Sequence, residues 1–200
     1  MEYIYEAHNM LPKTFCKEMI EKFESDSRRR QGETQGGAID HTLKKCTDLS
    51  IEHITGWGVE SNHLDDAFNT AFIDYQNNLK LNVFGEDKAH IVDHLFSGKN
   101  VVRNSLTFRK YQVGDYFKWH VDYNHSADRI CNFIIYLNDH EACTEFLNGK
   151  KIKPEAGKIV FFPTTWVHAH CGQPVEKGNK YMVTSFIHYD DTNERYTPVK

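Results

Sequence analysis

Residues 111–122 read Tyr-Gln-Val-Gly-Asp-Tyr-Phe-Lys-Trp-His-Val-Asp (YQVGDYFKWHVD) and end on a histidine and an aspartate one residue apart. Successive side chains of a β-strand point to opposite faces, so His120 and Asp122 share a face if this β-prone stretch is a strand. An imidazole and a carboxylate side by side bind one side of a metal ion. The pair alone is a weak signal, because the chain has twelve histidines and chance pairs are expected.

A third ligand has to come from elsewhere in the chain. His168 and His170 are the candidates, again two residues apart on a segment predicted to be extended. Two histidines and one carboxylate with open positions form the facial triad of non-haem iron(II) oxygenases. The same donor set also suits catalytic zinc. At this point both the metal and the choice between the two histidines stay open.

The residues around these candidates form an ordered set. They are Tyr111-Gln112-Val113-Gly114-Asp115-Tyr116, Tyr136-Leu137-Asn138, Phe162-Pro163, Pro174-Val175, Gly178, Lys180-Tyr181 and Thr184. In this order and spacing they resemble the iron(II)/2-oxoglutarate-dependent dioxygenases, specifically the prolyl 4-hydroxylase-like branch. The resemblance covers about residues 101–190. It implies a mainly β fold with supporting helices, in which a double-stranded β-helix (jelly-roll) core follows N-terminal α-helices.

The resemblance also implies the metal ligands. In this branch the distal histidine stands four residues before a Pro-Val and ten before the basic residue that binds the oxoacid. His170 has that spacing to Pro174 and Lys180, and His168 does not. The implied catalytic metal site is therefore Fe(II) held by His120, Asp122 and His170. The implied co-substrates are 2-oxoglutarate and O₂, with ascorbate to rescue oxidised iron.

Lys180 has an expected role that physical chemistry supports independently. A dianion bound inside a barrel needs a cation, because an unpaired buried charge is costly. On a strand, Lys180, Met182 and Thr184 share one face, so Thr184 can donate to the same carboxylate. The alternative is a solvated turn lysine. Tyr136, sixteen residues after His120, and Tyr111 match family positions near the oxoacid.

The sequence departs from the family where a Gly-Gly-x-Thr is usual, since Glu141-Ala142-Cys143-Thr144 stands there. The missing glycines leave the conformation of this loop near the pocket uncertain. Arg129, Trp119 and Trp166 are candidates for lining the substrate entrance, although each is also compatible with a structural role.

The sequence leaves more than one hypothesis for the substrate. The branch favours a prolyl residue in a peptide, whereas the absence of a separate peptide-binding module leaves room for a free amino acid or another small metabolite. The net charge of −4 argues against nucleic acid. Two other classes stay open: a zinc hydrolase with a His₂-carboxylate site, and a non-catalytic metal-binding β-barrel. Lys180 and Thr184 discriminate, because a hydrolase that binds no oxoacid has no use for them.

Composition and periodicity predict the organisation of the chain. With 200 residues, 40% hydrophobic and 26% charged, it fits one domain. Apolar residues at helical spacing predict helices over residues 11–25, with Thr14 as N-cap, and over about 62–81, with Asn62 at the start. From residue 101 short strands follow one another. We therefore expect a single dioxygenase domain over residues 1–200, with mostly helical support in 1–100 and the catalytic β core in 101–190.

Three features bear on location. No apolar run approaches the length needed to span a membrane. The five cysteines include no Cys-x-x-Cys pair, and Met1-Glu2-Tyr3 begins no visible leader sequence. These features predict a cytoplasmic protein without a membrane partner, and they leave the oligomeric state open.

Overall fold

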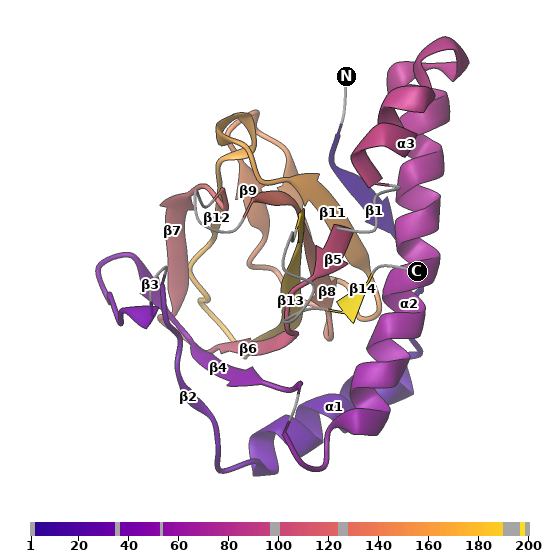
Figure 1. Ribbon diagram of the computed structural model, residues 1–200. Coiled ribbons are helices and arrows are strands. Elements are labelled where there is room, and N and C mark those ends of the chain that lie inside the picture. The colour runs from indigo at the N-terminus through magenta and orange to yellow at the C-terminus, as the bar shows by residue number, and fades with distance from the viewer. Residues whose placement is uncertain are drawn as a thin grey trace.

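The computed structural model describes residues 3–34, 37–52, 54–96, 101–123, 128–189 and 197–198. Two antiparallel β-sheets face each other, and the two long helices lie along the outer side of the larger sheet (Figure 1). The predicted mainly β core with supporting helices is confirmed.

The larger sheet runs, from one edge to the other, through β1 (Tyr5–Ala7), β11 (Ile159–Pro163), β8 (Arg129–Tyr136), β13 (Lys180–Tyr189), β6 (Thr107–Tyr111), β4 (Thr47–Ser50) and β2 (Arg30–Gln31). The far end of β13 also pairs with β5 (Val101–Arg103), which pairs with β14 (Thr197–Pro198). The smaller sheet contains β10 (Lys151–Ile152), β9 (Thr144–Phe146), β12 (His170–Gly172), β7 (Tyr116–His120) and β3 (Lys44–Lys45), in that order.

The central strand β8 is apolar throughout because it is covered on both faces. Phe133 and Ile135 belong to the core between the sheet and the helices. Ile134 and Tyr136, on the opposite face, belong to a second core between the two sheets. A strand buried on both faces reads as a continuous apolar run rather than an alternating one. The site described below lies on the inner face.

The helical elements are α1 (Lys13–Ser25), α2 (Gly58–Asn78), η2 (Leu79–Phe84), η3 (Glu86–Lys88), α3 (His90–Phe96) and η4 (Trp166–His168). The predicted starts of the two long helices are wrong. The N-cap of α1 is Pro12 rather than Thr14. Helix α2 begins before Asn62 because the buried Trp57, whose indole Nε1 donates to Asp26 Oδ2 at 2.9 Å, fixes the chain at its start. In the described ranges, no helix is long and apolar enough to cross a bilayer.

Aromatic contacts attach the helices to the sheet. On α1, Phe23 stacks on Phe108 of β6 with 4.2 Å between ring centroids. On α2, the ring centroid of Phe68 lies 4.5 Å from that of Phe133 of β8. Both helical side chains are at most 2% exposed, so each transfers a large apolar area out of water.

The N-terminal half contributes strands as well as helices, which the expectation of mostly helical support did not include. Strand β4 pairs with β6 of the larger sheet, and β3 pairs with β7 of the smaller one. The short segment 44–50 therefore belongs to both sheets, and it places the buried carboxylate of Asp48 opposite Arg109 of β6. Whether the chain divides functionally at residue 100 stays a prediction.

The packing of α2 gives a stability test with an internal control. Replacing Phe68 by Ala leaves a cavity against Phe133 and is expected to lower the free energy of unfolding by about 3–5 kcal/mol. Replacing Ile73, which is on the same helix but 52% exposed, by Ala is expected to lower the free energy of unfolding by less than about 1 kcal/mol. Urea denaturation followed by circular dichroism measures both. Equal losses would show that α2 does not pack through this face.

Candidate metal centre and co-substrate pocket

An irregularity in strand pairing prepares the candidate metal site. His170 of β12 lies opposite His120 of β7, and Gly172 lies opposite Phe117. Three steps along β7 thus correspond to two along β12, which is a β-bulge. The bulge puts Phe117 and His120 on one face, where their rings stack with centroids 3.5 Å apart. A regular strand would have turned them to opposite faces.

His120, Asp122 and His170 come together at the end of β7 and the start of β12. One potential ligand atom from each lies within 4.8 Å of the others. Asp122 Oδ1 is 3.6 Å from His120 Nε2, and its Oδ2 is 3.5 Å from His170 Nε2. Among the described residues, this is the one group of three histidine, cysteine or acidic side chains arranged to hold a metal ion.

Backbone carbonyls orient both imidazoles. Nδ1 of His120 lies 2.8 Å from the carbonyl oxygen of Lys118, and Nδ1 of His170 lies 3.1 Å from that of His168. Each Nδ1 therefore carries the proton and donates it, which leaves the Nε2 lone pair for a metal. His168 ends the short helix η4, so the extended segment predicted for it is wrong. It contributes its carbonyl oxygen to the orientation of His170.

The protonation states also suit a metal. Burial, together with the neighbouring His170, lowers the pKa of His120 to about 4, so its imidazole is neutral. Burial pushes the pKa of Asp122 upward, but His170, His120 and the amide of Asn132 outweigh it and hold that pKa below its usual value. Metal binding requires neutral imidazoles and an ionised carboxylate. The donor set fits iron(II), and equally zinc.

A narrow cavity of about 40 Å³ continues inward from these ligands. Both sheets line it, through Arg109, Tyr111, Phe117, His120, Asp122, Asn132, Ile134, Thr144, His170, Gly172, Lys180, Met182 and Thr184. The predicted Lys180, Thr184 and Tyr111 are among them. A volume of this size holds a few water molecules, so binding of a larger ligand would require lining side chains to move.

Lys180 is fully buried at the inner end of the cavity. Its Nζ donates to the carbonyl oxygen of Ala142 at 3.2 Å and lies 5.0 Å from the ring centroid of Tyr111. Among the described residues no carboxylate pairs with it, and burial lowers the pKa of its ammonium to about 8. The alternative of a solvated turn lysine is wrong. A buried ammonium without an acid partner is costly, and an anionic ligand would offset that cost.

Of the other predicted co-substrate residues, Thr184 lines the cavity and Tyr136 does not. Met182 and Thr184 share the cavity face with Lys180, as the strand period predicted. The hydroxyl of Tyr136 is 2.7 Å from Thr144 Oγ1, so Tyr136 contacts the cavity wall through Thr144 rather than lining it.

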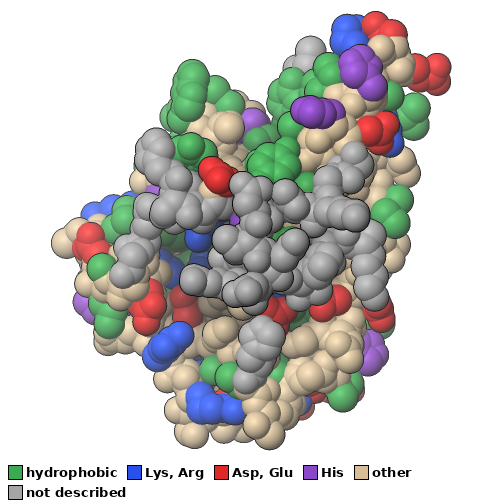
Figure 2. Space-filling view, viewed as in Figure 1, with side chains coloured by type: hydrophobic (Ala, Val, Ile, Leu, Met, Phe, Trp, Pro, Cys, Tyr) green, Lys and Arg blue, Asp and Glu red, His purple; other side chains and the backbone are tan. Residues whose placement is uncertain are grey.

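The three predicted substrate residues do not line the cavity. Arg129 donates to the carbonyl oxygen of Asp122 at 3.3 Å, and its guanidinium carbon lies 3.7 Å from the ring centroid of Phe186. Trp119 and Trp166 are 48% and 76% exposed. Exposed hydrophobic side chains project from the end of the molecule where β9 and β12 lie (Figure 2). A role in substrate binding stays a prediction for all three.

Residues that the sequence reasoning missed include Arg109, Phe117, Asn132 and Thr144. Two carried a usable signal. Arg109 precedes Tyr111 by two residues on a strand and so shares its face. Asn132 interrupts an otherwise apolar run, and a polar residue in a strand buried on both faces needs a partner, which here is Asp122.

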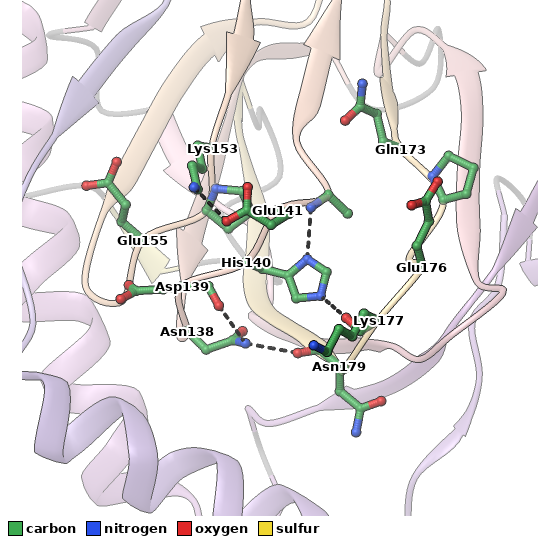
Figure 3. A pocket seen from close by; sticks show the side chains of 14 residues that line it. Asn138, Asp139, His140, Glu141, Lys153, Glu155, Gln173, Glu176, Lys177 and Asn179 are labelled. Atoms are coloured by element: carbon green, nitrogen blue, oxygen red, sulfur yellow. Dashed lines mark hydrogen bonds and ion pairs between the residues drawn. The ribbon is translucent and has the colours of Figure 1, made fainter.

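A larger hollow, of about 1,120 Å³, lies between three loops (Figure 3). Its polar groups bind one another: Lys153 pairs with Glu141 at 2.7 Å, and His140 bridges the amide of Ala142 and the carbonyl of Lys177, both at 2.9 Å. These bonds hold the chain where the family's glycines are missing, and they fix the Ala142 carbonyl that binds Lys180.

Comparisons with known proteins agree with this architecture. Residues 106–188 match the family model of the 2OG-Fe(II) oxygenase superfamily. A PKHD-type hydroxylase from Synechococcus sp. (strain CC9902) is 29% identical over 93 residues, which cover 42% of this chain and 41% of that protein. The chain thus spans about two-fifths of the length of that curated relative.

Solved prolyl hydroxylases share the fold over nearly the whole chain. The prolyl hydroxylase from Trichoplax adhaerens, solved with a hypoxia inducible factor peptide, superposes with a TM-score of 0.72 at 13% identity and covers 94% of this chain and 84% of that one. The viral collagen prolyl hydroxylase from Paramecium Bursaria Chlorella virus-1, solved with 2-oxoglutarate, gives 0.63 at 16% identity, covering 94% and 97%. A Pseudomonas putida prolyl-4-hydroxylase gives 0.62 at 13%, covering 95% and 94%.

These similarities define a double-stranded β-helix fold, and the candidate metal ligands line a cavity between its two sheets. Over residues 106–188 the chain is similar to the 2OG-Fe(II) oxygenase superfamily, and its fold resembles that of solved prolyl hydroxylases. The family implies Fe(II), 2-oxoglutarate and O₂, and the donor set described above fits the metal.

The geometry predicts which histidine binds the metal. Replacing Asp122 or His170 by Ala is expected to abolish tight Fe(II) binding, since each removes one of three ligands. Replacing His168 by Ala is expected to leave most of the affinity, because alanine keeps the carbonyl that orients His170. Anaerobic titration calorimetry measures the three variants. Intact binding in the His170 variant with loss in the His168 variant would contradict the assignment.

Proposed function

We propose that the chain is an Fe(II)- and 2-oxoglutarate-dependent dioxygenase that hydroxylates a C–H bond with release of succinate and CO₂. The observation that carries this proposal is the fully buried Lys180, without a described acid partner, in the same narrow cavity as the His120, Asp122 and His170 group. A metal site alone does not require that lysine. A metal site with an anion-binding ammonium behind it suits an oxoacid that reaches from one to the other.

The protein's own residues bind and orient in this mechanism. Iron(II) with 2-oxoglutarate and O₂ supplies the oxidising chemistry, so no general base is required. His120, Asp122 and His170 would hold the metal, and a set of two histidines and one carboxylate leaves coordination positions for the co-substrates. Asn132 donates through its amide to Oδ2 of Asp122, which orients the carboxylate that would bind the metal.

Lys180 and Thr184 would bind the distal carboxylate of 2-oxoglutarate, the ammonium by charge and the hydroxyl by donation. Tyr136 supports this end through Thr144, and Tyr111 packs its ring near the ammonium. A zinc hydrolase gives these groups no purpose, which is why we prefer the oxygenase. Ascorbate as the rescuing reductant belongs to the same proposal, and a cytoplasmic location stays a prediction.

A prolyl residue in a peptide is the proposed substrate, with a free amino acid or other small metabolite as the alternative. The resemblance to the prolyl 4-hydroxylases supports the peptide. The test is Fe(II)-dependent succinate formation from 2-oxoglutarate under air, with a panel of proline-containing peptides and free amino acids. Stimulation by a peptide supports the prolyl assignment, and stimulation by free amino acids alone supports the alternative. Complete absence of Fe(II)-dependent succinate would contradict the proposed function.

Substitutions at the inner end of the cavity separate co-substrate binding from metal binding. Replacing Lys180 by Ala is expected to weaken 2-oxoglutarate binding by on the order of 3–5 kcal/mol, because one partner of a buried charge pair is lost. Replacing Thr184 by Val is expected to cost about 1–2 kcal/mol, for one hydrogen bond to a charged group. Calorimetry at saturating Fe(II) measures both. Unchanged 2-oxoglutarate affinity in the Lys180 variant would place the oxoacid elsewhere.

The buried ammonium also predicts a pH dependence. Burial lowers the pKa of Lys180 to about 8, and a bound carboxylate stabilises its protonated form. Affinity for 2-oxoglutarate is therefore expected to be constant well below pH 8 and to fall above it, by at most about tenfold per pH unit. Calorimetry across this range measures the fall. The matched control is Lys180→Arg, whose guanidinium stays charged, and an equal fall in that variant would contradict the assignment.

A further inference from the structure

The cavity contains a second cation that the proposed mechanism does not use. Arg109 lies on β6, two residues before Tyr111, and its side chain is 18% exposed at the cavity wall. In the strand register it stands between Asp48 of β4 and Met182 of β13. The arginine thus shares the face of the sheet from which Met182 and Lys180 line the cavity.

Asp48 is a weak and shared partner for this guanidinium. Its Oδ1 lies 3.4 Å from Arg109 Nε, and the buried Nε makes no hydrogen bond. Its Oδ2 accepts from the ammonium of Lys44 at 3.0 Å, and its Oδ1 also accepts from the thiol of Cys46 at 3.2 Å. Lys44 is 1% exposed, so one carboxylate serves two buried or partly buried cations. Among the residues that the structure describes, one positive charge of this trio is left without an acid.

Counting charge in the loaded site sharpens the point. Iron(II) and Lys180 together carry three positive charges, and the two carboxylates of 2-oxoglutarate with that of Asp122 carry three negative ones. The metal and its co-substrate are therefore balanced without Arg109. The surplus charge of the Lys44, Arg109 and Asp48 trio remains, and it is costly because these side chains are largely buried and Arg109 lines the cavity.

We propose that Arg109 is a specificity-determining residue that binds a carboxylate of the substrate beside the metal. The inference rests on the proposed function and narrows its substrate to molecules that carry a carboxylate near the C–H bond to be hydroxylated. A planar guanidinium suits this task, because it binds a carboxylate through two parallel hydrogen bonds. The carboxylate belongs either to a free amino acid or to an acidic residue next to the target in a peptide.

The test compares carboxylates with their amides. One arm uses free L-amino acids, L-proline among them, and their primary amides. The other uses end-blocked proline peptides in which Glu or Gln precedes the proline. Calorimetry without O₂ measures their binding to the Fe(II)- and 2-oxoglutarate-loaded protein. The carboxylate member of at least one pair is expected to bind about tenfold tighter or more, and the arm in which this occurs identifies the source.

Variants assign that preference to the arginine. Arg109→Gln is expected to abolish the difference between acid and amide while changing 2-oxoglutarate affinity by less than about threefold. Arg109→Lys is the matched control and is expected to retain part of the preference, because the charge remains. Lys44 still pairs with Asp48 in both, and thermal denaturation checks that both fold.

Four results would overturn the inference. They are equal binding of acids and amides, no binding of any carboxylate in the panel, a preference that survives in Arg109→Gln, and a loss of 2-oxoglutarate affinity in that variant as large as in Lys180→Ala. The last would make Arg109 a co-substrate residue. Failure of the parent protein to bind 2-oxoglutarate at all is a separate outcome, which contradicts the proposed function itself.

Discussion

The site depends on the contacts that the buried carboxylate of Asp122 makes with His120, His170 and Asn132. The carboxylate lies between the Nε2 atoms of His120 and His170, and the amide of Asn132, from the opposite sheet, donates to it. A buried carboxylate is costly unless it is paired and hydrogen-bonded. Its three partners come from β7, β8 and β12, so both sheets have to be in place before the charge is satisfied. The same arrangement gathers the donors that a divalent cation needs.

A second buried charge works differently. The ammonium of Lys180 donates to a carbonyl oxygen and lies near an aromatic ring, no described carboxylate pairs with it, and burial depresses its pKa. Within the described part of the chain, no acid offsets this cost. An unpaired buried charge of this kind is typical of binding sites, where the ligand supplies the opposite charge. The loops around the larger hollow contribute by fixing the Ala142 carbonyl, although the family's glycines are absent there.

The sequence predicted the parts of the fold and site that follow from strand period and family spacing. The apolar run of β8 indicated a strand covered on both faces, and the two-residue period put Lys180, Met182 and Thr184 on one face. The family spacing favoured His170, and the structure brings His170 rather than His168 to Asp122.

What the sequence did not predict depends on tertiary structure. The bulge in β7 that places Phe117 beside His120 is a mismatch between two strands, so no single strand's pattern contains it. The strands around residues 44–50 are too short to give a period, and with them the sequence reasoning missed the pairing of Asp48 with Arg109. The sequence identified Trp119 and Trp166 as aromatic candidates for substrate binding. It could not show that both are exposed and that neither lines the cavity.

The central claim is that the three ligands and Lys180 form one site for a metal chelated by an oxoacid. Absorption spectroscopy without O₂ tests it most directly, by titrating the Fe(II)-loaded protein with 2-oxoglutarate. The account predicts a weak visible charge-transfer band that saturates at one equivalent and needs both components. Absence of the band when calorimetry shows that both have bound would mean that iron and the oxoacid occupy separate sites, and would contradict the account.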